Sequence, residues 1–139
     1  LLMAYGNDLG HWGEDIAVEY MTGNGWYLRH RNWCYDGIEI DQVYIDEEDS
    51  ILVFVEVKTR STDMYGNPSE AVDAEKRRRI VHAAAAYLTA FKKENREVRY
   101  DIISIIGTPD TQHTIRHIED AFTMLDPYED FSVSRRYRI

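Results

Sequence analysis

Cysteine is almost absent from this sequence. Cys34 is the single cysteine among 139 residues, so neither an internal disulfide nor a cysteine-rich zinc site can form. This shortage favours a reducing compartment, most simply the cytoplasm. We expect Cys34 to be a small buried side chain, the ordinary role of a lone cysteine.

Long apolar runs are missing as well. Apolar runs such as Ile51 to Val55 have the length of a strand, whereas a membrane-spanning helix needs about 20 apolar residues. The N-terminus also lacks the basic region, apolar stretch and small-residue cleavage site of a signal peptide. We therefore expect no membrane association.

Positive charge is scarce. Lys and Arg number 16 against 25 Asp and Glu, which gives a formal net charge of −9. Because contacts to phosphate need Lys and Arg, this balance argues against a strong general nucleic-acid binder. Local clusters partly relieve the shortage, above all the basic run from Lys76 to Arg79.

Hydrophobic and aromatic residues are well represented. They make up 44% and 12% of the chain, which is typical of globular proteins and not of disordered ones. The length suits one compact domain and is too short for two. We place a single domain at residues 8–122 and a C-terminal extension, polar and aromatic without a clear period, at residues 123–139.

Hydrophobic periodicity predicts two helices and five strands. Apolar residues at helical spacing predict a first helix over 8–21, with Asn7 or Asp8 as its N-cap, and a longer one over 69–94, capped by Ser69. The order α-β-β-β-α-β-β implies an α/β fold with a mixed central sheet flanked by helices. The predicted strands are 26–34, 38–46, 51–58, 98–106 and 113–118.

Four charged side chains fall on the second and third predicted strands. If the residues flanking the turn before Ile51 form a pair, residue numbers across this antiparallel hairpin sum to 97. Asp41 then lies opposite Glu56, Glu39 lies opposite Lys58, and all four share one face. Directly opposed carboxylates repel one another, so the pair needs a counter-ion.

A divalent cation, Mg²⁺ or Mn²⁺, would supply that charge through carboxylate oxygens. Asp41 and Glu56 would be ligands, the Val57 carbonyl a third, and Lys58 would position the attacking water. This arrangement suits phosphodiester hydrolysis, in which the ion polarises the phosphate and lowers the pKa of a bound water. The alternative is an exposed sheet face with a Glu39–Lys58 ion pair and solvated acids.

These residues carry a resemblance to a known fold family. Asp41, followed after a hairpin by Glu56-Val57-Lys58, resembles the PD-(D/E)-x-K core of restriction enzymes and archaeal Holliday-junction resolvases. More closely, the chain is similar to the small bacterial YraN-like family, uncharacterised protein family 0102, although the family's Gly-Glu-Ile-Asp has Ile38 inserted after Gly37 here. The matching segments are Gly10-His11-Trp12-Gly13-Glu14 with Ala17, Arg31-Asn32, Gly37-Ile38-Glu39-Ile40-Asp41, Phe54-Val55-Glu56-Val57-Lys58-Thr59-Arg60, Glu70-Ala71-Val72 with Lys76, Arg99-Tyr100-Asp101 and Ala121-Phe122.

The resemblance implies a restriction-endonuclease-like fold and a metal-dependent endonuclease that acts on DNA, branched or damaged, with a homodimer as the natural form for cutting two strands. It also implies Glu14 as a catalytic residue and further metal ligand; the alternative for Glu14 is an exposed carboxylate stabilised by the helix dipole. Lys76, with Arg60 and Arg77, would contact nucleic acid, or Lys76 belongs to a solvated basic face.

Two other positions receive minor roles. We expect Asp101 to be structural, and Gln42 to point to the opposite face of the sheet with no role in the site. Two functional alternatives stay open. The protein either keeps the nuclease fold as a weakly active or inactive nucleic-acid-binding scaffold, which the charge of −9 favours, or is an interaction module whose acidic face binds a basic partner.

Overall fold

The computed structural model describes residues 5–62 and 72–123, with side chains from residue 8 on. The order of its elements, α-β-β-β-α-β-β, confirms the prediction. No helix in this described part is long and apolar enough to cross a membrane. The elements are α1 (Tyr5–Gly23), β1 (Tyr27–Tyr35), β2 (Ile38–Ile45), β3 (Ile51–Arg60), α2 (Ala74–Ala90), β4 (Glu97–Ile106) and β5 (Thr114–Phe122).

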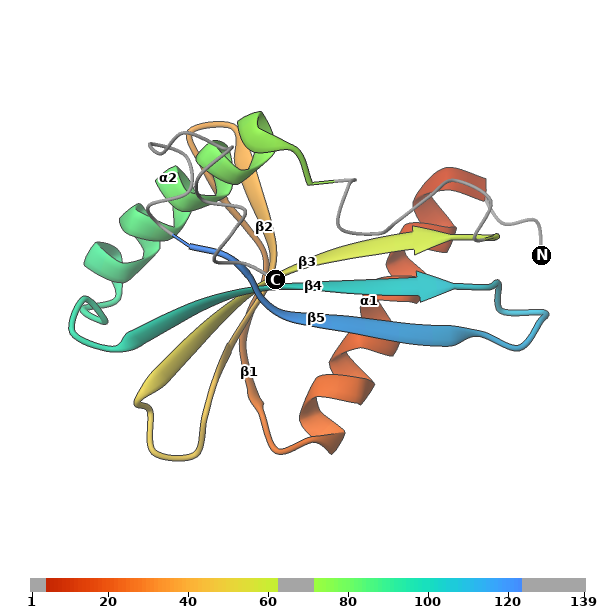
Figure 1. Ribbon diagram of the computed structural model, residues 1–139, viewed down its shortest axis with the longest axis horizontal. Coiled ribbons are helices and arrows are strands. Elements are labelled where there is room, and N and C mark those ends of the chain that lie inside the picture. The colour runs from red at the N-terminus through yellow and green to blue at the C-terminus, as the bar shows by residue number, and fades with distance from the viewer. Residues whose placement is uncertain (1–4, 63–71, 124–139) are drawn as a thin grey trace.

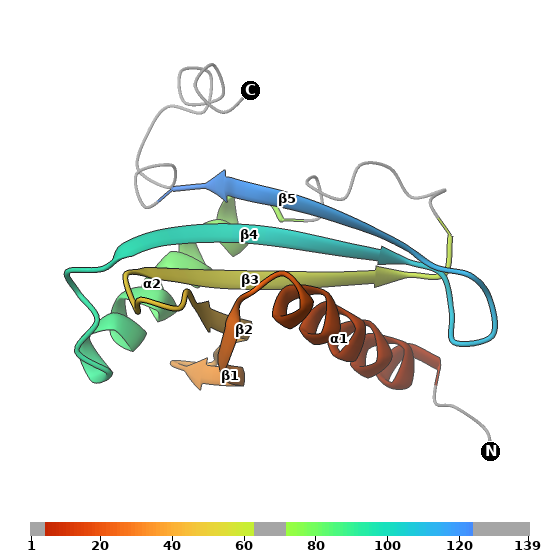
Figure 2. The same cartoon turned by 90° about the horizontal axis from the view of Figure 1, so that it is seen from below.

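The strands form one mixed sheet in the order β1-β2-β3-β4-β5. Among the described strands only β3 and β4 run parallel, because α2 carries the chain back between them; the other neighbours are antiparallel. Figures 1 and 2 show α1 and α2 on opposite faces of the sheet and toward opposite ends of it. The predicted α/β class with a mixed sheet flanked by helices is therefore confirmed.

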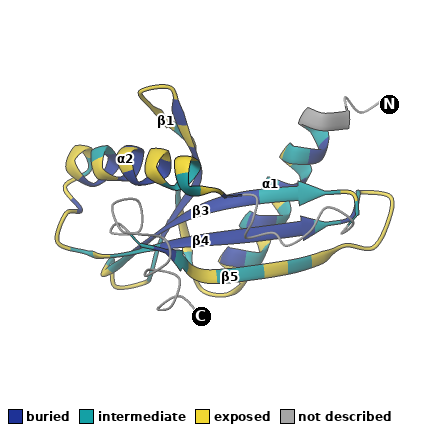
Figure 3. Ribbon diagram, turned by 45° about the horizontal axis from the view of Figure 1, so that its top comes forward, coloured by how far each residue is buried: buried dark blue, intermediate teal, exposed yellow. Residues whose placement is uncertain are grey.

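Burial follows this three-layer arrangement. The central strands β3 and β4 are covered on both faces and are mostly buried. The edge strands β1 and β5 consist mostly of exposed and half-buried residues (Figure 3). Two apolar clusters result, one on each face of the sheet. One packs α2 against Ile40, Phe54 and Tyr100, and the other packs Ala17 and Met21 of α1 against the opposite face.

Helix starts differ from the prediction. Because α1 begins at Tyr5, Asn7 and Asp8 lie inside its first turn and do not cap it. The N-cap of α2 is Asp73, whose side chain accepts a hydrogen bond from the Lys76 N–H at 2.9 Å. The predicted cap, Ser69, lies outside the described residues, as does the C-terminal extension after residue 123.

The β2–β3 register is the predicted one, but it stops early. Residues 42–45 pair with residues 55–52, so partner numbers sum to 97, and the pairing ends at Gln42. Strand β2 pairs with β1 along its whole length, so residues 38–40 pair with β1 but have no partner in β3. The first half of β2 therefore parts from β3, and a wedge opens beside Glu56 and Lys58.

Helix α1 approaches the end of β3 very closely at Gly13. A Cβ atom at this position would lie 1.9 Å from Thr59 Oγ1 and 2.9 Å from Thr59 Cβ. Threonine is short and branched, so it cannot swing away from such a contact. Gly10, one turn earlier in the same helix, has nothing within 4 Å of the equivalent point.

We predict opposite effects for two alanine substitutions in α1. Gly10→Ala should stabilise the protein by up to about 1 kcal/mol, because alanine favours the helix and the space is open. Gly13→Ala should destabilise it by roughly 1–3 kcal/mol, because overpacking against Thr59 outweighs the same helix gain. Urea unfolding of both variants measures the difference. Equal stabilisation by both would show that α1 is not held against β3 at Gly13.

Candidate active site

A cavity of about 430 Å³ occupies the wedge between the first half of β2, β3 and the start of α2. Three of its carboxylates come from the strands predicted to form the site, and the cations come from α2. Its lining residues are Ile38, Glu39, Asp41, Glu56, Asp73, Glu75, Lys76, Arg79 and Ile80.

Asp41 lies where the two strands part. It is only 9% exposed, and its Oδ2 accepts a hydrogen bond from the Val57 N–H at 2.8 Å. Burial and the neighbouring Glu56 carboxylate raise the pKa of Asp41 to about 8, although the Val57 hydrogen bond opposes the shift. The site thus holds a carboxylate whose charge is poorly compensated by the protein itself.

Glu56 is the second buried acid, 6% exposed. Its Oε1 lies 2.5 Å from Lys76 Nζ and 3.7 Å from Lys58 Nζ. Burial, followed by the adjacent Lys76 ammonium, lowers the pKa of Lys58. The predicted association of Glu56 with Lys58 is present, but the closer cation is Lys76, which we expected to contact nucleic acid or to belong to a solvated basic face.

Glu14 reaches the same region from α1. Its carboxylate accepts a hydrogen bond from Asn32 Nδ2 at 3.3 Å and lies 3.7 Å from the Arg31 guanidinium. The same Asn32 amide donates to Glu39 Oε1 at 3.2 Å. Carboxylate oxygens of Glu14, Glu39 and Asp41 all lie within 4.8 Å of one another. The structure therefore brings Glu14 to Asp41, as the resemblance implied, and adds Glu39.

Gln42 has a role that sequence reasoning missed. It does point to the face opposite Asp41, where it is fully buried, and its Nε2 donates to the Glu14 carbonyl oxygen at 2.9 Å. The Tyr44 hydroxyl in turn donates to Gln42 Oε1. A buried polar residue on a strand beside a candidate acid was the available signal, because such a residue needs hydrogen-bond partners. Gln42 fixes the backbone that carries Glu14.

Two expectations are wrong: the ion pair between Glu39 and Lys58, and the burial of Cys34. Among the described residues Glu39 forms no ion pair with Lys58, because the β2–β3 pairing that would oppose them ends at Gln42. Cys34 is exposed and not buried, since it lies on edge strand β1. Its Sγ instead lies 3.7 Å from the Asn32 carbonyl oxygen and 4.0 Å from Glu39 Oε2.

The acid group is suited to a hard divalent cation. Its donors are all carboxylate oxygens, the type that Mg²⁺ and Mn²⁺ prefer. Oxygens that share one ion at about 2.1 Å lie at most roughly 4.2 Å apart, so the 4.8 Å span needs only a small contraction. Glu14, Glu39 and Asp41 therefore fit such an ion, whereas the predicted ligand Glu56 lies outside this group. The Val57 carbonyl as a ligand stays a prediction.

The residues predicted to contact nucleic acid differ in how close they lie to the cavity. Lys76 lines it, and so does Arg79, which belongs to the same basic run. Arg77 turns away: its Nε donates to the Val72 carbonyl oxygen and its guanidinium lies 5.5 Å from the Phe122 ring centroid. Arg60 stands at the end of β3, and its carbonyl oxygen accepts a hydrogen bond from the Gly107 N–H.

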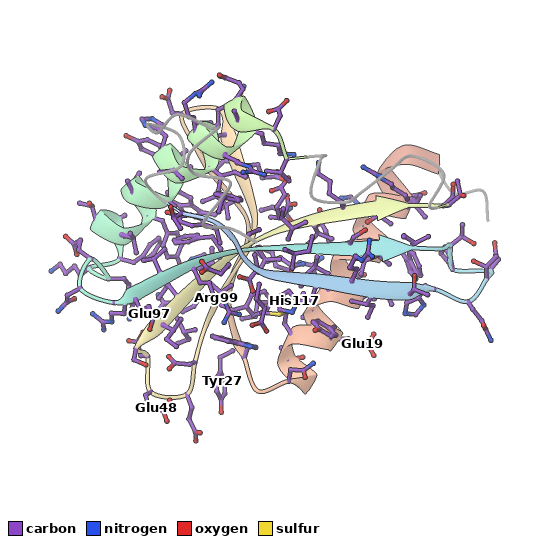
Figure 4. The ribbon with its side chains drawn as sticks, in the orientation of Figure 1. Glu19, Tyr27, Glu48, Glu97, Arg99 and His117 are labelled. Carbon is purple, nitrogen blue, oxygen red and sulfur yellow. The ribbon has the colours of Figure 1, made fainter. Side chains whose placement is uncertain are left out.

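A separate polar cluster surrounds Asp101, which is fully buried. Arg99 donates two hydrogen bonds to its carboxylate at 2.9 and 2.8 Å, and His117 Nε2 lies 2.6 Å from it. Burial by itself would raise the pKa of Asp101, but the hydrogen bonds from His117 and Arg99 hold it below its usual value. Arg99 and His117, labelled in Figure 4, come from neighbouring strands, so Asp101 ties β4 to β5.

We predict that Asp41→Asn stabilises the protein when a chelator is present. The pKa of Asp41 is about 8 in the folded state against an ordinary value of 3.8. At a pH between these two values, Asp41 is protonated in the folded state and ionised in the unfolded state. Stability contributed by this group therefore falls as pH rises from about 4 to about 8. Asparagine removes this loss and can still accept the Val57 N–H. Urea unfolding should show a gain of roughly 2–4 kcal/mol at pH 8 and almost none near pH 4.

Asp46→Asn is the matched control with the opposite sign. Hydrogen bonds from the Ser50 hydroxyl and the Ile51 N–H lower the pKa of Asp46 to about 2. Its stabilising contribution is therefore complete above about pH 4 and is lost as pH falls through about 2. This variant should be less stable than the wild type at neutral pH. Parallel stability curves for Asp41→Asn and the wild type from pH 4 to 8 would contradict the electrostatic account of the site.

Comparison with known proteins identifies relatives along most of the chain. The model of a family described as uncharacterised protein family UPF0102 matches residues 13–105. A UPF0102 protein of Bacteroides thetaiotaomicron is 45% identical over 120 residues, which cover 86% of this chain and 96% of the relative. The UPF0102 protein of Myxococcus xanthus is 41% identical, covering 83% and 89%, and that of Clostridium perfringens is 34% identical, covering 85% and 96%.

The matched segment contains every carboxylate of the candidate site. Glu14 lies at its beginning, and Asp41 and Glu56 lie well inside it together with both lysines. The match extends over more than half of the chain, and the relatives are matched along nearly their whole length. The chain therefore belongs to the uncharacterised protein family UPF0102.

Proposed function

We propose that the protein is a metal-dependent endonuclease-like hydrolase that cleaves phosphodiester bonds in DNA. The observation that carries the proposal is the buried acid pair, Asp41 and Glu56, at one cavity with Lys58 beside it. A carboxylate with a strongly raised pKa in a cavity is a functional-site candidate, because burial without compensation lowers stability. The resemblance of Asp41 and Glu56-Val57-Lys58 to the PD-(D/E)-x-K core supports the same reaction.

The acids and the lysine have distinct roles in this proposal. Asp41 and Glu56, with Glu14 and Glu39 beside them, would hold a Mg²⁺ or Mn²⁺ ion. When bound, such an ion lowers the pKa of a water molecule and offsets charge on the phosphate. Lys58 is half-buried and has a lowered pKa, so it can orient the attacking water and exchange a proton with it.

DNA would approach from the side of α2. Arg79 and Lys76 line the cavity and can contact phosphate oxygens, and Arg60 stands at the end of the strand that carries Glu56. The overall charge of −9 opposes general DNA binding, so the affinity depends on these few cations. Branched or damaged DNA as the substrate belongs to the proposal and rests on the fold resemblance alone.

We predict Mg²⁺- or Mn²⁺-dependent cleavage by the wild type and its loss in two variants. Glu56→Gln removes a ligand charge and Lys58→Met removes the water-positioning ammonium, so each should lower the cleavage rate at least about 100-fold. The assay uses labelled linear, flapped and four-way DNA with each metal ion, and with a chelator as the blank. Glu48→Gln is the matched control, since Glu48 is exposed in the β2–β3 turn, far from the cavity (Figure 4).

The outcomes separate the proposal from its alternative. If the wild type cleaves none of these DNAs with either ion, and Asp41→Asn changes neither metal affinity nor thermal stability, the enzymatic proposal is wrong. DNA binding without cleavage, lost on substitution of Lys76 and Arg79, would instead support a scaffold that keeps the nuclease fold. Salt titration of the binding distinguishes phosphate contacts from other modes.

A further inference from the structure

The closest ion pair in the cavity joins helix α2 to strand β3. Lys76 Nζ lies 2.5 Å from Glu56 Oε1, closer than the Lys58 ammonium at 3.7 Å. The Glu56 side chain is almost fully buried, whereas the Lys76 side chain is 36% exposed. One partner is therefore fixed in the fold, and the other has a path toward solvent through the cavity.

The position of Lys76 within α2 is unfavourable for the helix itself. Lys76 is the third helical residue after the Asp73 cap, at the end where the helix dipole is positive. Basic residues are disfavoured there and carboxylates are preferred. The backbone of Lys76 is nevertheless anchored, because its N–H donates to Asp73 Oδ1 at 2.9 Å. Its charge is explained by the acids that it faces and not by helix stability.

Those acids need a cation. Asp41 and Glu56 are buried at one cavity, and the carboxylates of Glu14 and Glu39 gather beside Asp41. Like charges in such an arrangement repel strongly when they are removed from water. The Lys76 ammonium is the cation in closest contact with the buried Glu56, so it offsets more of the Glu56 charge than the Lys58 ammonium at 3.7 Å.

The same carboxylate oxygen cannot serve two cations equally well. An ion coordinated by Glu56 would lie about 2.1 Å from its oxygen, where Lys76 Nζ already lies within 2.5 Å of Oε1. The two positive centres would then be less than about 5 Å apart in a poorly solvated cavity, where like charges are strongly disfavoured. Because only the flexible stem of Lys76 needs to move, displacement of the ammonium is the simplest resolution.

We propose that the Lys76 ammonium is an exchangeable counter-ion, which neutralises Glu56 in the ion-free protein and is displaced when a divalent cation binds. The inference deepens the proposed function and rests on it, since it concerns the same acids. Displacement leaves the Lys76 ammonium in the cavity next to Arg79, free to bind a phosphate. Cation binding would thereby switch the cavity from a closed ion pair to an anion-binding surface.

Metal affinity measured without any DNA tests the proposal. Lys76→Met keeps the length of the stem but removes the competing charge, so calorimetric titration with Mn²⁺ should show binding at least about tenfold tighter than in the wild type. In the presence of a chelator the same variant should melt roughly 5 °C or more below the wild type, since Glu56 loses its partner. Lys76→Arg keeps the charge and should keep the affinity of the wild type.

Arg78→Met is the matched control, because Arg78 lies on the same helix but is exposed and pairs only with Glu75 among the described residues. It should change the Mn²⁺ affinity less than twofold. Displacement itself is measured by amine acylation and mass spectrometry: Mn²⁺ should raise the labelling of Lys76 relative to the exposed Lys92. Unchanged labelling would show that the ammonium stays on Glu56.

The results distinguish this inference from the proposed function. Tighter Mn²⁺ binding by Lys76→Met without any DNA cleavage by the wild type would support the exchange and overturn the nuclease proposal. DNA cleavage by the wild type, with equal Mn²⁺ affinity in Lys76→Met, would overturn the exchange alone. Weaker Mn²⁺ binding by Lys76→Met, or no binding by any variant, would also overturn it.

Discussion

One hydrogen bond organises the candidate site: the Val57 N–H donates to the Asp41 carboxylate at the point where β2 leaves β3. In an uninterrupted antiparallel ladder, backbone groups of β2 and β3 would continue to pair across this position. Here a side chain accepts the donor, so β2 can turn toward α2 without leaving a buried N–H unsatisfied. The cavity exists because the ladder ends in this way.

The two helices bring opposite charges to that opening. Helix α1 carries Glu14, which is held through its side chain by Asn32 and through its backbone by Gln42. Helix α2 carries Lys76 and Arg79. The sheet between them supplies the buried acids Asp41 and Glu56 together with Lys58, so the cations of the site come from α2 and from β3. A chain with a net charge of −9 can therefore still present cations where an anionic substrate would bind.

Patterns confined to one strand or hairpin were predictable. Alternation and the short turn before Ile51 were enough to give the register of residues 42–45 with β3, and helical spacing gave the element order. The predictions that failed concern features that depend on a strand leaving regular geometry or on contacts between segments distant in the sequence. The splay of β2 removed the Glu39–Lys58 pair, and the Lys76–Glu56 contact joins a helix to a strand twenty residues earlier. Asn32, which bridges two acids, has a φ of 52°, a conformation that no periodicity signals.

The single parallel pairing in the sheet also sets the order in which the site can assemble. Strands β1, β2 and β3 are joined by short turns and can pair as soon as they are synthesised, which brings Asp41 and Glu56 together by local contacts. Pairing of β3 with β4, as of Val57 with Ile103, must wait for the long crossover that contains α2. Asp41 and Glu56 thus meet before the Lys76 ammonium of α2 reaches Glu56. Until α2 docks, the acids of this hairpin repel one another and Lys58 is the cation of the hairpin that offsets their charge.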